Sequence, residues 1–463
     1  MDRTQMFWLM MLWLSVRSKG NVETGCIVGL RPVFNGQLLN HMRSLEIVNF
    51  SCIREANIEL NRLTIIIGPQ ASGKSVISKL LFFFFDLGNL QRIAIEGGKD
   101  FDGFKILLKK KFSELFPISA WGDRQFKILF CIGEHEFKLT RTIYNDKLTE
   151  NIRVSSSKNV ETFYKSQVDI FKKLSKQAPS DEVQDDVDAA IEFRSVMSRA
   201  LARDHGADAV RTQFFIPAGR AFFTNLGRAI AAFEQARLLD PITVRFARLY
   251  TLYLDRFKSR RGFQNKEMTR LFENLLGGKL VASDDGDYVV TEDGRTVPFS
   301  ALSSGQQEMM PLFVTLLSLM PTMQPPILRR AGRLIYIEEP EAHLFPQAQS
   351  ELVQILAAVV AEKRVGTDLL LTTHSPYVLA KLNNLILGGD TAKTSQANAD
   401  AVAKILPIKS LLRSSMVQAY AIQEGVLTSI LNSDGLIDAE YLDDISGKIA
   451  EEFDELLNIG DRF

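Results

Sequence analysis

Mainly apolar runs lie at 63–67, 334–337 and 369–371; the first is followed by a glycine-containing stretch, and the other two are followed directly by polar or charged residues. Runs of this kind are typical of strands that are covered on both faces, as in a parallel sheet. Apolar helix patterns follow the first run at 76–85 and precede the second run at 306–320. The pattern predicts an α/β fold in which buried helices flank the sheet.

Shorter strand patterns predict an antiparallel part of the same fold. Residues 45–50 and 56–60 read as strands, and the runs at 126–131 and 136–141 resemble a hairpin around Gly133. A second strand pair is expected at 279–282 and 288–291, with the turn at 284–286. We therefore expect a mixed sheet with flanking helices and an antiparallel β lobe.

The stretch from 160 to 276 differs in character from the rest. Apolar residues recur at helical spacing at 189–201 and again at 222–257, and an apolar strand with a turn lies between them at 214–220. Acidic residues at 181, 182, 185 and 186 stand where a helix start is expected. These features predict an inserted helical subdomain.

The N-terminus contains an apolar run at 6–14 that stops near Val16, before Arg17 and Lys19. It is too short to span a bilayer. It has the length of the apolar region of a signal peptide, but residues 17–20 make a poor cleavage site. We favour a third interpretation, in which Met42 is the natural start and residues 1–41 are an upstream extension of doubtful function.

The net charge is zero, because the sequence contains 55 Lys and Arg residues and 55 Asp and Glu residues. No net field therefore steers the protein to nucleic acid or to a membrane. A local basic patch is the candidate nucleic-acid contact, with a solvated helix end as the ordinary alternative: Arg256, Lys258, Arg260 and Arg261. The three cysteines are widely spaced and fit neither a disulfide framework nor a zinc site, which agrees with a cytoplasmic location.

The most specific motif lies between the first apolar run and its helix and has the form G-x-x-x-x-G-K-[ST]. Glycines let backbone N–H groups curl around phosphate oxygens, and the helix start adds its positive dipole end. Lys74 can reach the β- and γ-phosphates, and the Ser75 hydroxyl can bind Mg²⁺. The predicted nucleotide-binding residues are Gly68, Pro69, Gln70, Ala71, Ser72, Gly73, Lys74, Ser75 and Val76.

A second turn suited to phosphate opens the helix pattern at 306–320, although ordinary helix capping explains such a turn equally well. Its residues are Ser303, Ser304, Gly305 and Gln306.

Acidic residues follow the second apolar run. Pro340 ends the strand, so Glu338 and Glu339 are expected at its carboxyl end, where parallel sheets bind ligands. Adjacent strand residues point to opposite faces, so the two carboxylates should have different roles. One can serve Mg²⁺ and the other can orient or deprotonate water. His374 follows the third run and can donate a hydrogen bond to a γ-phosphate.

These four motifs, in this order, resemble the ABC-type ATPases. The sequences at 303–308, 338–344 and 372–376 resemble the RecF/OLD-like branch, whose members are soluble bacterial ATPases related to the SMC heads. The resemblance implies an ABC-type P-loop ATPase head that uses ATP and Mg²⁺. In it Lys74 and Ser75 bind phosphate and metal, Glu338 takes the metal-side role, and Glu339 polarises the attacking water.

The same resemblance implies a homodimer. Residues 303–306 would close over the γ-phosphate of a second subunit, and His374 would sense that phosphate. Two positions depart from the common ABC pattern, because Glu338 stands where most members have Asp and Ser304 where many have Gly. The glutamine of the usual Q-loop cannot be placed, and Gln91 is a guess.

The implied domain order has five parts. Residues 1–41 are the extension, 42–159 the first part of the head with the P-loop, and 160–276 the helical insertion. Residues 277–400 carry the turn at 303–306, here called the signature turn, and the acidic strand end with Glu338 and Glu339. They also carry His374, the switch histidine. Residues 401–463 add the closing strands and a helix. The sequence shows no Toprim nuclease domain, no SMC-length coiled coil and no transmembrane segment.

Three functions remain open. We favour the ATPase subunit of a prokaryotic, anti-phage type defence system that acts with a separately encoded nuclease or toxin. A RecF-like DNA repair ATPase is the alternative, and the ATP-binding subunit of a membrane transporter is less well supported. The helical insertion and the form of the acidic motif count against transport.

Overall fold

The computed structural model describes residues 43–177, 183–204, 206–226, 239–260, 265–283, 286–319, 332–362, 366–438 and 451–456. Several sequence predictions lie outside these residues. They are the extension at 1–41 with Met42 as the start, the acidic pair at 181–182, the turn residues 284–285, Arg261 of the basic patch and most of the closing helix.

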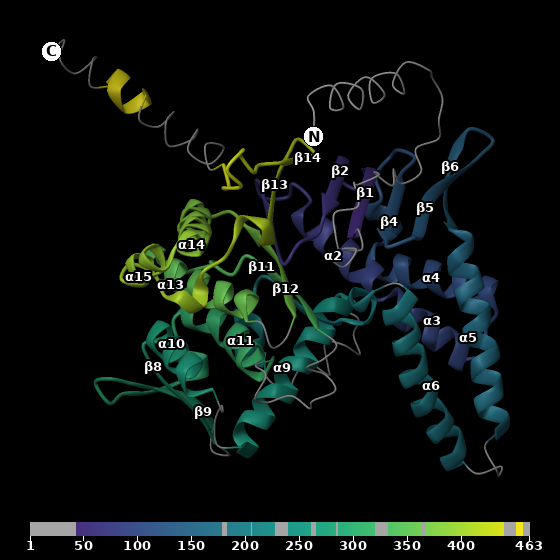
Figure 1. Ribbon diagram of the computed structural model, residues 1–463, viewed down its shortest axis with the longest axis horizontal. Coiled ribbons are helices and arrows are strands. Elements are labelled where there is room, and N and C mark those ends of the chain that lie inside the picture. Colours follow the sequence, from purple (N-terminus) through teal and green to yellow (C-terminus); the bar gives the residue numbers. More distant parts are fainter. Residues whose placement is uncertain are drawn as a thin grey trace. The chain divides into compact units, whose positions relative to one another are not determined.

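The three apolar runs form three adjacent strands toward one edge of the main sheet (Figure 1). Together with one further strand they run parallel, in the spatial order β3 (Leu63–Ile67), β12 (Thr367–Thr373), β11 (Arg333–Glu338) and β7 (Thr212–Ile216). Successive residues of a strand enter opposite apolar cores, so Ile335 packs on one side of the sheet and Tyr336 on the other. Burial on both faces explains why these strands read as unbroken apolar runs.

The antiparallel part extends the same sheet, which has eleven strands among the described residues. Its strands are β1 (Arg43–Phe50), β2 (Ile53–Glu59), β4 (Lys127–Ile132), β5 (His135–Tyr144) and β6 (Lys147–Ser156). β13 (Val417–Gln423) pairs parallel to β3, and β14 (Val426–Ser429) joins β13 to β2. The predicted mixed α/β sheet is confirmed. A separate small sheet contains β8 (Gly278–Ser283), β9 (Gly286–Thr291) and β10 (Thr296–Pro298).

Helices cover both faces of the main sheet. The core on one face includes residues of α2 (Lys74–Phe85), α3 (Leu87–Glu96), α4 (Phe101–Leu115), α5 (Lys158–Gln177) and α6 (Val183–Asp204). The other face carries α7 (Ala221–Leu226), α9 (Pro241–Arg260), α10 (Lys266–Leu276), α11 (Ser304–Leu319), α13 (Pro346–Ala361) and α14 (Pro376–Thr394), with α15 (Gln396–Ala403) beside α14. None of the described helices is both long and apolar enough to cross a bilayer.

Burial fixes the position of the helix that follows the P-loop. The four phenylalanines at its end, 82–85, are all buried, as the apolar pattern predicts. Phe82 packs edge-to-face on Phe215 of β7 and on Tyr336 of β11, and Phe84 stacks on Phe130 of β4. Aromatic pairs of this geometry add about 0.5–1.5 kcal/mol each beyond their area burial. α2 is thereby anchored to the parallel and the antiparallel halves of the sheet.

The range 160–276, predicted as a helical insertion, contains α5, α6, α7, α9 and α10 and also a strand of the main sheet. That strand is β7, which pairs in register with β11, with Ile337 opposite Ile216. The described residues all belong to one compact unit. Part of the range therefore helps to build the sheet edge on which the candidate site lies.

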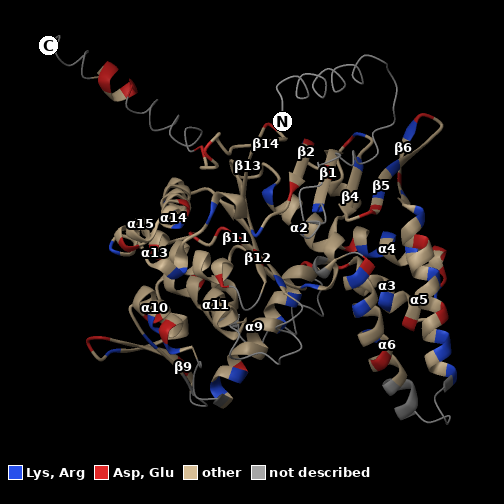
Figure 2. Ribbon diagram, in the orientation of Figure 1, with Lys and Arg blue, Asp and Glu red and all other residues tan. Residues whose placement is uncertain are grey.

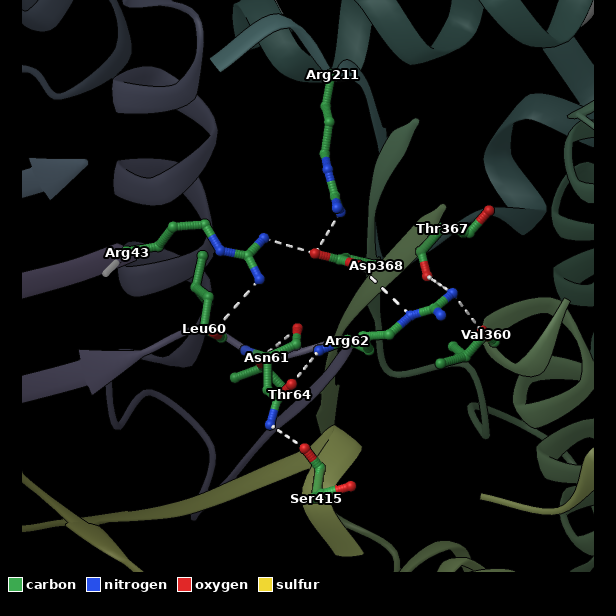
Figure 3. A network of polar contacts seen from close by, with 10 residues as sticks. All are labelled: Arg43, Leu60, Asn61, Arg62, Thr64, Arg211, Val360, Thr367, Asp368 and Ser415. Carbon is green, nitrogen blue, oxygen red and sulfur yellow. Dashed lines mark hydrogen bonds and ion pairs between the residues drawn. The ribbon is translucent and has the colours of Figure 1, made fainter. Parts of the chain in front are cut away.

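A buried carboxylate ties the opposite, amino-terminal ends of the parallel strands together (Figure 3). Asp368, at the start of β12, is 1% exposed and is surrounded by three arginines. Arg43 Nη1 lies 2.5 Å from Asp368 Oδ2, Arg211 pairs with the same oxygen, and Arg62 Nε lies 3.9 Å from Oδ1. Arg62 also donates to the carbonyl of Val360 at 2.7 Å. One carboxylate thus joins segments that enter β1, β3, β7 and β12.

Candidate active site

The loop between β3 and α2 takes its shape from two glycines. Gly73 has φ +109°, in the left-handed region, and α2 begins at the next residue. A Cβ on Gly68 would lie 2.5 Å from the carbonyl oxygen of Ile422, on the neighbouring strand β13. Both positions of the motif therefore require glycine for a reason that the structure makes explicit.

Lys74 turns back over this loop. Its Nζ donates to the carbonyl oxygens of Gly68 and Pro69, each at 2.8 Å, and the side chain is buried. Burial lowers the pKa of Lys74, against the opposing effect of the nearby carboxylates, of which Glu339 contributes most. Both hydrogen-bond partners are neutral, so the ammonium group can exchange them for phosphate oxygens, which are stronger acceptors.

Parallel register brings the acidic strand end to the P-loop. Glu338 pairs with Thr372, and Ile67 pairs with Thr373, so β11, β12 and β3 end at the same edge of the sheet. The Glu338 carboxylate is buried, and the Ser75 side chain lies near enough to influence its ionisation. Burial raises the pKa of Glu338, and the interaction with Ser75 opposes that rise. The structure thus brings the two predicted metal-side residues together.

Glu339 points to a different partner, as expected for adjacent residues at a strand end. Its Oε1 lies 3.0 Å from His374 Nε2, and the hydrogen bond from His374 lowers its pKa. Glu339 has φ +43°, a conformation that is uncommon for residues with a Cβ. Its backbone N–H still donates to Thr372 at 3.0 Å, which fixes the turn after β11.

Glu341, which the sequence analysis leaves without a role, supports the switch histidine. Its Oε1 accepts from Thr373 Oγ1 and from the backbone N–H of His374, both at 2.7 Å. The side chain is buried. Glu341 therefore positions the segment that carries His374. Its place directly after Pro340 was the available signal, but a sequence does not indicate which neighbouring loop a carboxylate will contact.

Arg220 is a second residue that the sequence analysis missed. It follows β7 and is completely buried, beneath the acidic strand end. Its Nη1 donates to the carbonyls of Glu338 at 2.7 Å and Pro217 at 3.0 Å, and its Nη2 donates to the carbonyl of Glu339 at 3.0 Å. The guanidinium group thus holds both peptide groups that carry the acidic pair.

The turn at 303–306 forms a reciprocal capping box at the start of α11. Ser303 N–H donates to Gln306 Oε1 at 3.0 Å, and the Gln306 N–H lies 3.4 Å from Ser303 Oγ. Gln306 Nε2 also donates to the carbonyl of Leu276 at 2.6 Å. Ser303 and Ser304 are exposed, and in the part of the chain that the structure describes, no hydrogen bond joins this turn to the P-loop. The turn therefore does cap its helix, and the side chains of Ser303 and Ser304 remain exposed to solvent.

A family model described as "AAA domain, putative AbiEii toxin, Type IV TA system" matches residues 63–380. The match includes the P-loop, the acidic strand end and His374, and it covers more than half of the chain. The chain belongs to this AAA-domain family. It is accordingly a P-loop ATPase-type protein.

Solved structures similar to this AAA-domain chain include three SMC heads. The SMC head domain from Thermotoga maritima is 12% identical, with a TM-score of 0.34, and 84% of this chain and 98% of that chain are covered. The SmcHead bound to the C-winged helix domain of ScpA is 12% identical, with a TM-score of 0.38 and coverages of 84% and 97%. The third is an Smc head domain with an extended coiled coil bound to the C-terminal domain of ScpA, derived from Pyrococcus furiosus. It is 14% identical, with a TM-score of 0.33 and coverages of 89% and 99%. A comparison with curated proteins returned no match.

The residues of this AAA-domain chain fit a magnesium ion at the P-loop. Glu338 Oε1 is buried and has no hydrogen-bond partner among the described residues, and the other end of the carboxylate faces the N–H of Ala218 at 3.4 Å. With the Ser75 hydroxyl it offers the oxygen ligands that Mg²⁺ prefers. No group of three or more His, Cys, Asp or Glu side chains within the described ranges is placed to hold a metal ion.

Gln91 and the described part of the basic patch lie away from these groups. Gln91, on α3, lines a small cavity of about 30 Å³ among apolar side chains that include Phe84, Phe130 and Leu201. The basic patch lies at the C-terminal end of α9, where Figure 2 shows Lys and Arg. One member of the patch is already neutralised, because Lys258 Nζ lies 2.9 Å from Asp287.

Replacing Lys74 with alanine is expected to weaken ATP binding by about 10- to 100-fold, because a charged hydrogen-bond donor contributes about 1.5–3 kcal/mol. Isothermal titration with ATP and Mg²⁺ measures the loss. Lys111→Ala is the matched control, since Lys111 is an exposed lysine on α4 that pairs with Glu114. Equal affinities for the two variants would contradict the role assigned to Lys74.

Proposed function

We propose that the chain is a Mg²⁺-dependent ATPase that dimerises on ATP and acts as the switch subunit of a bacterial, anti-phage type defence system with a separately encoded effector. The observation that carries the proposal is the convergence of three groups at one sheet edge. They are the Lys74 ammonium, the Ser75–Glu338 contact and the Glu339–His374 pair. The family description, with its Type IV TA system, supports a role beside a second component.

The chemistry assigns a different task to each group. The lowered pKa of Glu339 keeps its carboxylate ionised at neutral pH, so it can accept a proton from an attacking water. His374 holds that carboxylate, and Lys74 donates to the phosphate oxygens on which negative charge develops. Bound at Ser75 and Glu338, Mg²⁺ would supply further positive charge to the phosphates.

Dimerisation follows from the exposed turn at the start of α11. Its helix N-terminus and the hydroxyls of Ser303 and Ser304 suit a phosphate, yet among the described residues no hydrogen bond joins them to the P-loop of their own chain. In a head-to-tail dimer each nucleotide would lie between one P-loop and the partner's turn. ATP would then stabilise the closed dimer selectively, which is the requirement for a ligand-driven switch.

Sedimentation of Glu339→Gln with and without ATP tests the switch, since this variant should bind ATP without consuming it. We expect ATP to double the mass. Adding Ser303→Arg should keep the chain monomeric through steric and charge conflict at the interface, while ATP still binds to the single chain. Ser113→Arg, at an exposed position on α4, is the control and should still dimerise. An unchanged mass with ATP would refute the model.

The effector is tested separately, by purifying the tagged full chain from its host and identifying what accompanies it in stoichiometric amount. A nuclease or toxin supports the defence role. Recovery of DNA repair proteins, together with DNA binding that is lost on neutralising Arg256, would instead favour the RecF-like alternative.

A further inference from the structure

The environment of Arg220 links two parts of the proposed site that are distant in sequence. Its Nε donates to the carbonyl oxygen of Glu308 at 3.2 Å, and the Glu308 carboxylate is the buried counter-ion, 3.5 Å from Nε. Glu308 lies in the first turns of α11, a few residues after the exposed serines. The same guanidinium group therefore contacts the signature helix on one side and the acidic strand end on the other.

Glu308 also fixes the turn from which Arg220 comes. Its Oε2 accepts from the backbone N–H of Arg220 at 2.9 Å, and its Oε1 accepts from that of Ala221, the first residue of α7, at 3.1 Å. Each nitrogen of the Arg220 guanidinium group thus donates to a carbonyl oxygen, and each oxygen of the Glu308 carboxylate accepts from a backbone N–H. The planar fork of an arginine holds such contacts rigidly, unlike the single ammonium of a lysine.

A second contact joins the same two regions. A Cβ on Gly305 would lie 2.7 Å from the carbonyl oxygen of His343, so the signature turn packs directly on the loop that follows the acidic pair. From Glu308 onward α11 is buried on all sides, which leaves it little room to adjust. The turn at 303–306 is therefore packed closely against the loop that follows Glu338 and Glu339.

We propose that Arg220 is a positioning residue that couples the signature turn of each chain to the catalytic carboxylates of the same chain. This inference rests on the proposed ATP dimer. When a partner's nucleotide draws the turn towards it, Glu308 moves, and Arg220 carries the movement to the peptide groups of Glu338 and Glu339. Each of the two ATP sites then responds to occupancy of the other.

The backbone of Glu339 is placed to respond to a movement of Arg220. It sits in the left-handed region at φ +43°, and Arg220 bonds its carbonyl oxygen at 3.0 Å. A residue in this conformation is stable only because its neighbours hold it, so a small change in Arg220 alters the direction of its carboxylate.

The test compares Arg220→Lys and Glu308→Gln with Arg62→Lys. Lysine keeps the positive charge but cannot reach Glu308, Glu338 and Glu339 together. Glutamine keeps the size of Glu308, but its amide can accept only one of the two backbone N–H groups. Arg62 is the matched control, because it too contacts a buried carboxylate and a backbone carbonyl, at the opposite end of the parallel strands.

Three quantities are measured for each full-length variant: the rate of ATP hydrolysis against ATP concentration, the ATP affinity of the monomer in a Ser303→Arg background, and the mass with ATP. The wild type should show cooperativity, with a Hill coefficient approaching 2, the value for two strongly coupled sites. In Arg220→Lys and Glu308→Gln it should fall to about 1, and kcat should fall about tenfold. Monomer affinity should stay within about twofold. Arg62→Lys should lower the melting temperature without changing cooperativity.

The outcomes separate the two proposals. A Glu339→Gln chain that does not dimerise on ATP refutes the proposed switch, and the coupling inference falls with it. A cooperative dimer whose Hill coefficient and kcat survive both Arg220→Lys and Glu308→Gln overturns the coupling alone. If Arg220→Lys does not fold, the milder Glu308→Gln decides the question by the same two readouts.

Discussion

Replacing Glu339 with glutamine is expected to lower kcat for ATP hydrolysis by at least about 100-fold while ATP binding is retained. The amide cannot accept the proton of the attacking water, whereas Lys74, the P-loop and Glu338 remain in place to hold the nucleotide. A phosphate-release assay at saturating ATP measures turnover, and titration calorimetry measures binding. Turnover equal to that of the wild type would show that another group is the base.

His374→Ala tests how far Glu339, the proposed base, depends on its hydrogen bond from His374. The hydrogen bond from His374 lowers the pKa of Glu339, so the ionised base is present above that depressed pKa and is lost as the pH falls through it. Without His374 the pKa of Glu339 should rise, and the acid limb of the pH–rate profile should move to higher pH. An acid limb that stays in place would mean that Glu339 does not control it.

Asp368→Asn should destabilise the fold by about 3–5 kcal/mol, because it removes the charged partner of three clustered arginines and leaves them facing one another. Chemical denaturation followed by fluorescence measures the free energy of unfolding. Asp102→Asn is the control, since Asp102 forms an exposed ion pair with Lys105 on α4 and should change stability little. Similar stability of the two variants would show that the arginines find other partners.

The parts of the site that were predictable from the sequence are those whose chemistry is local. Gly68 to Ser75 form one continuous loop, and Pro340 marks the end of its strand without any tertiary information. The parallel register of β3, β12 and β11 then brings Lys74, Glu339 and His374 together, as strand-end positions predict. The buried apolar runs likewise predicted three strands of the parallel part of the sheet.

Contacts between distant segments account for what was missed. Arg220 lies in a stretch that the sequence predicts as a turn after an apolar strand. The hydrogen-bond partners of its Nη atoms are backbone carbonyls, which every residue has, so no residue type in the sequence indicates them. β7 was recognised as a strand, but parallel partners are not encoded locally, so its place beside β11 could not be derived. Glu308 lies in the motif at 303–308, but its counter-ion Arg220 lies 88 residues away in the sequence.

The position of β13 has a consequence for the synthesis of the chain. Leu63 at the start of the P-loop strand pairs with Leu369 on one side and with Val417 on the other, and Ile422 of β13 packs against Gly68. The ribosome releases the P-loop long before β12 and β13, the strands that enclose it. Because such long-range pairing is slow to form, the nascent chain carries a complete P-loop sequence without a finished pocket. Nucleotide capture is thus deferred until β13 has been synthesised and paired.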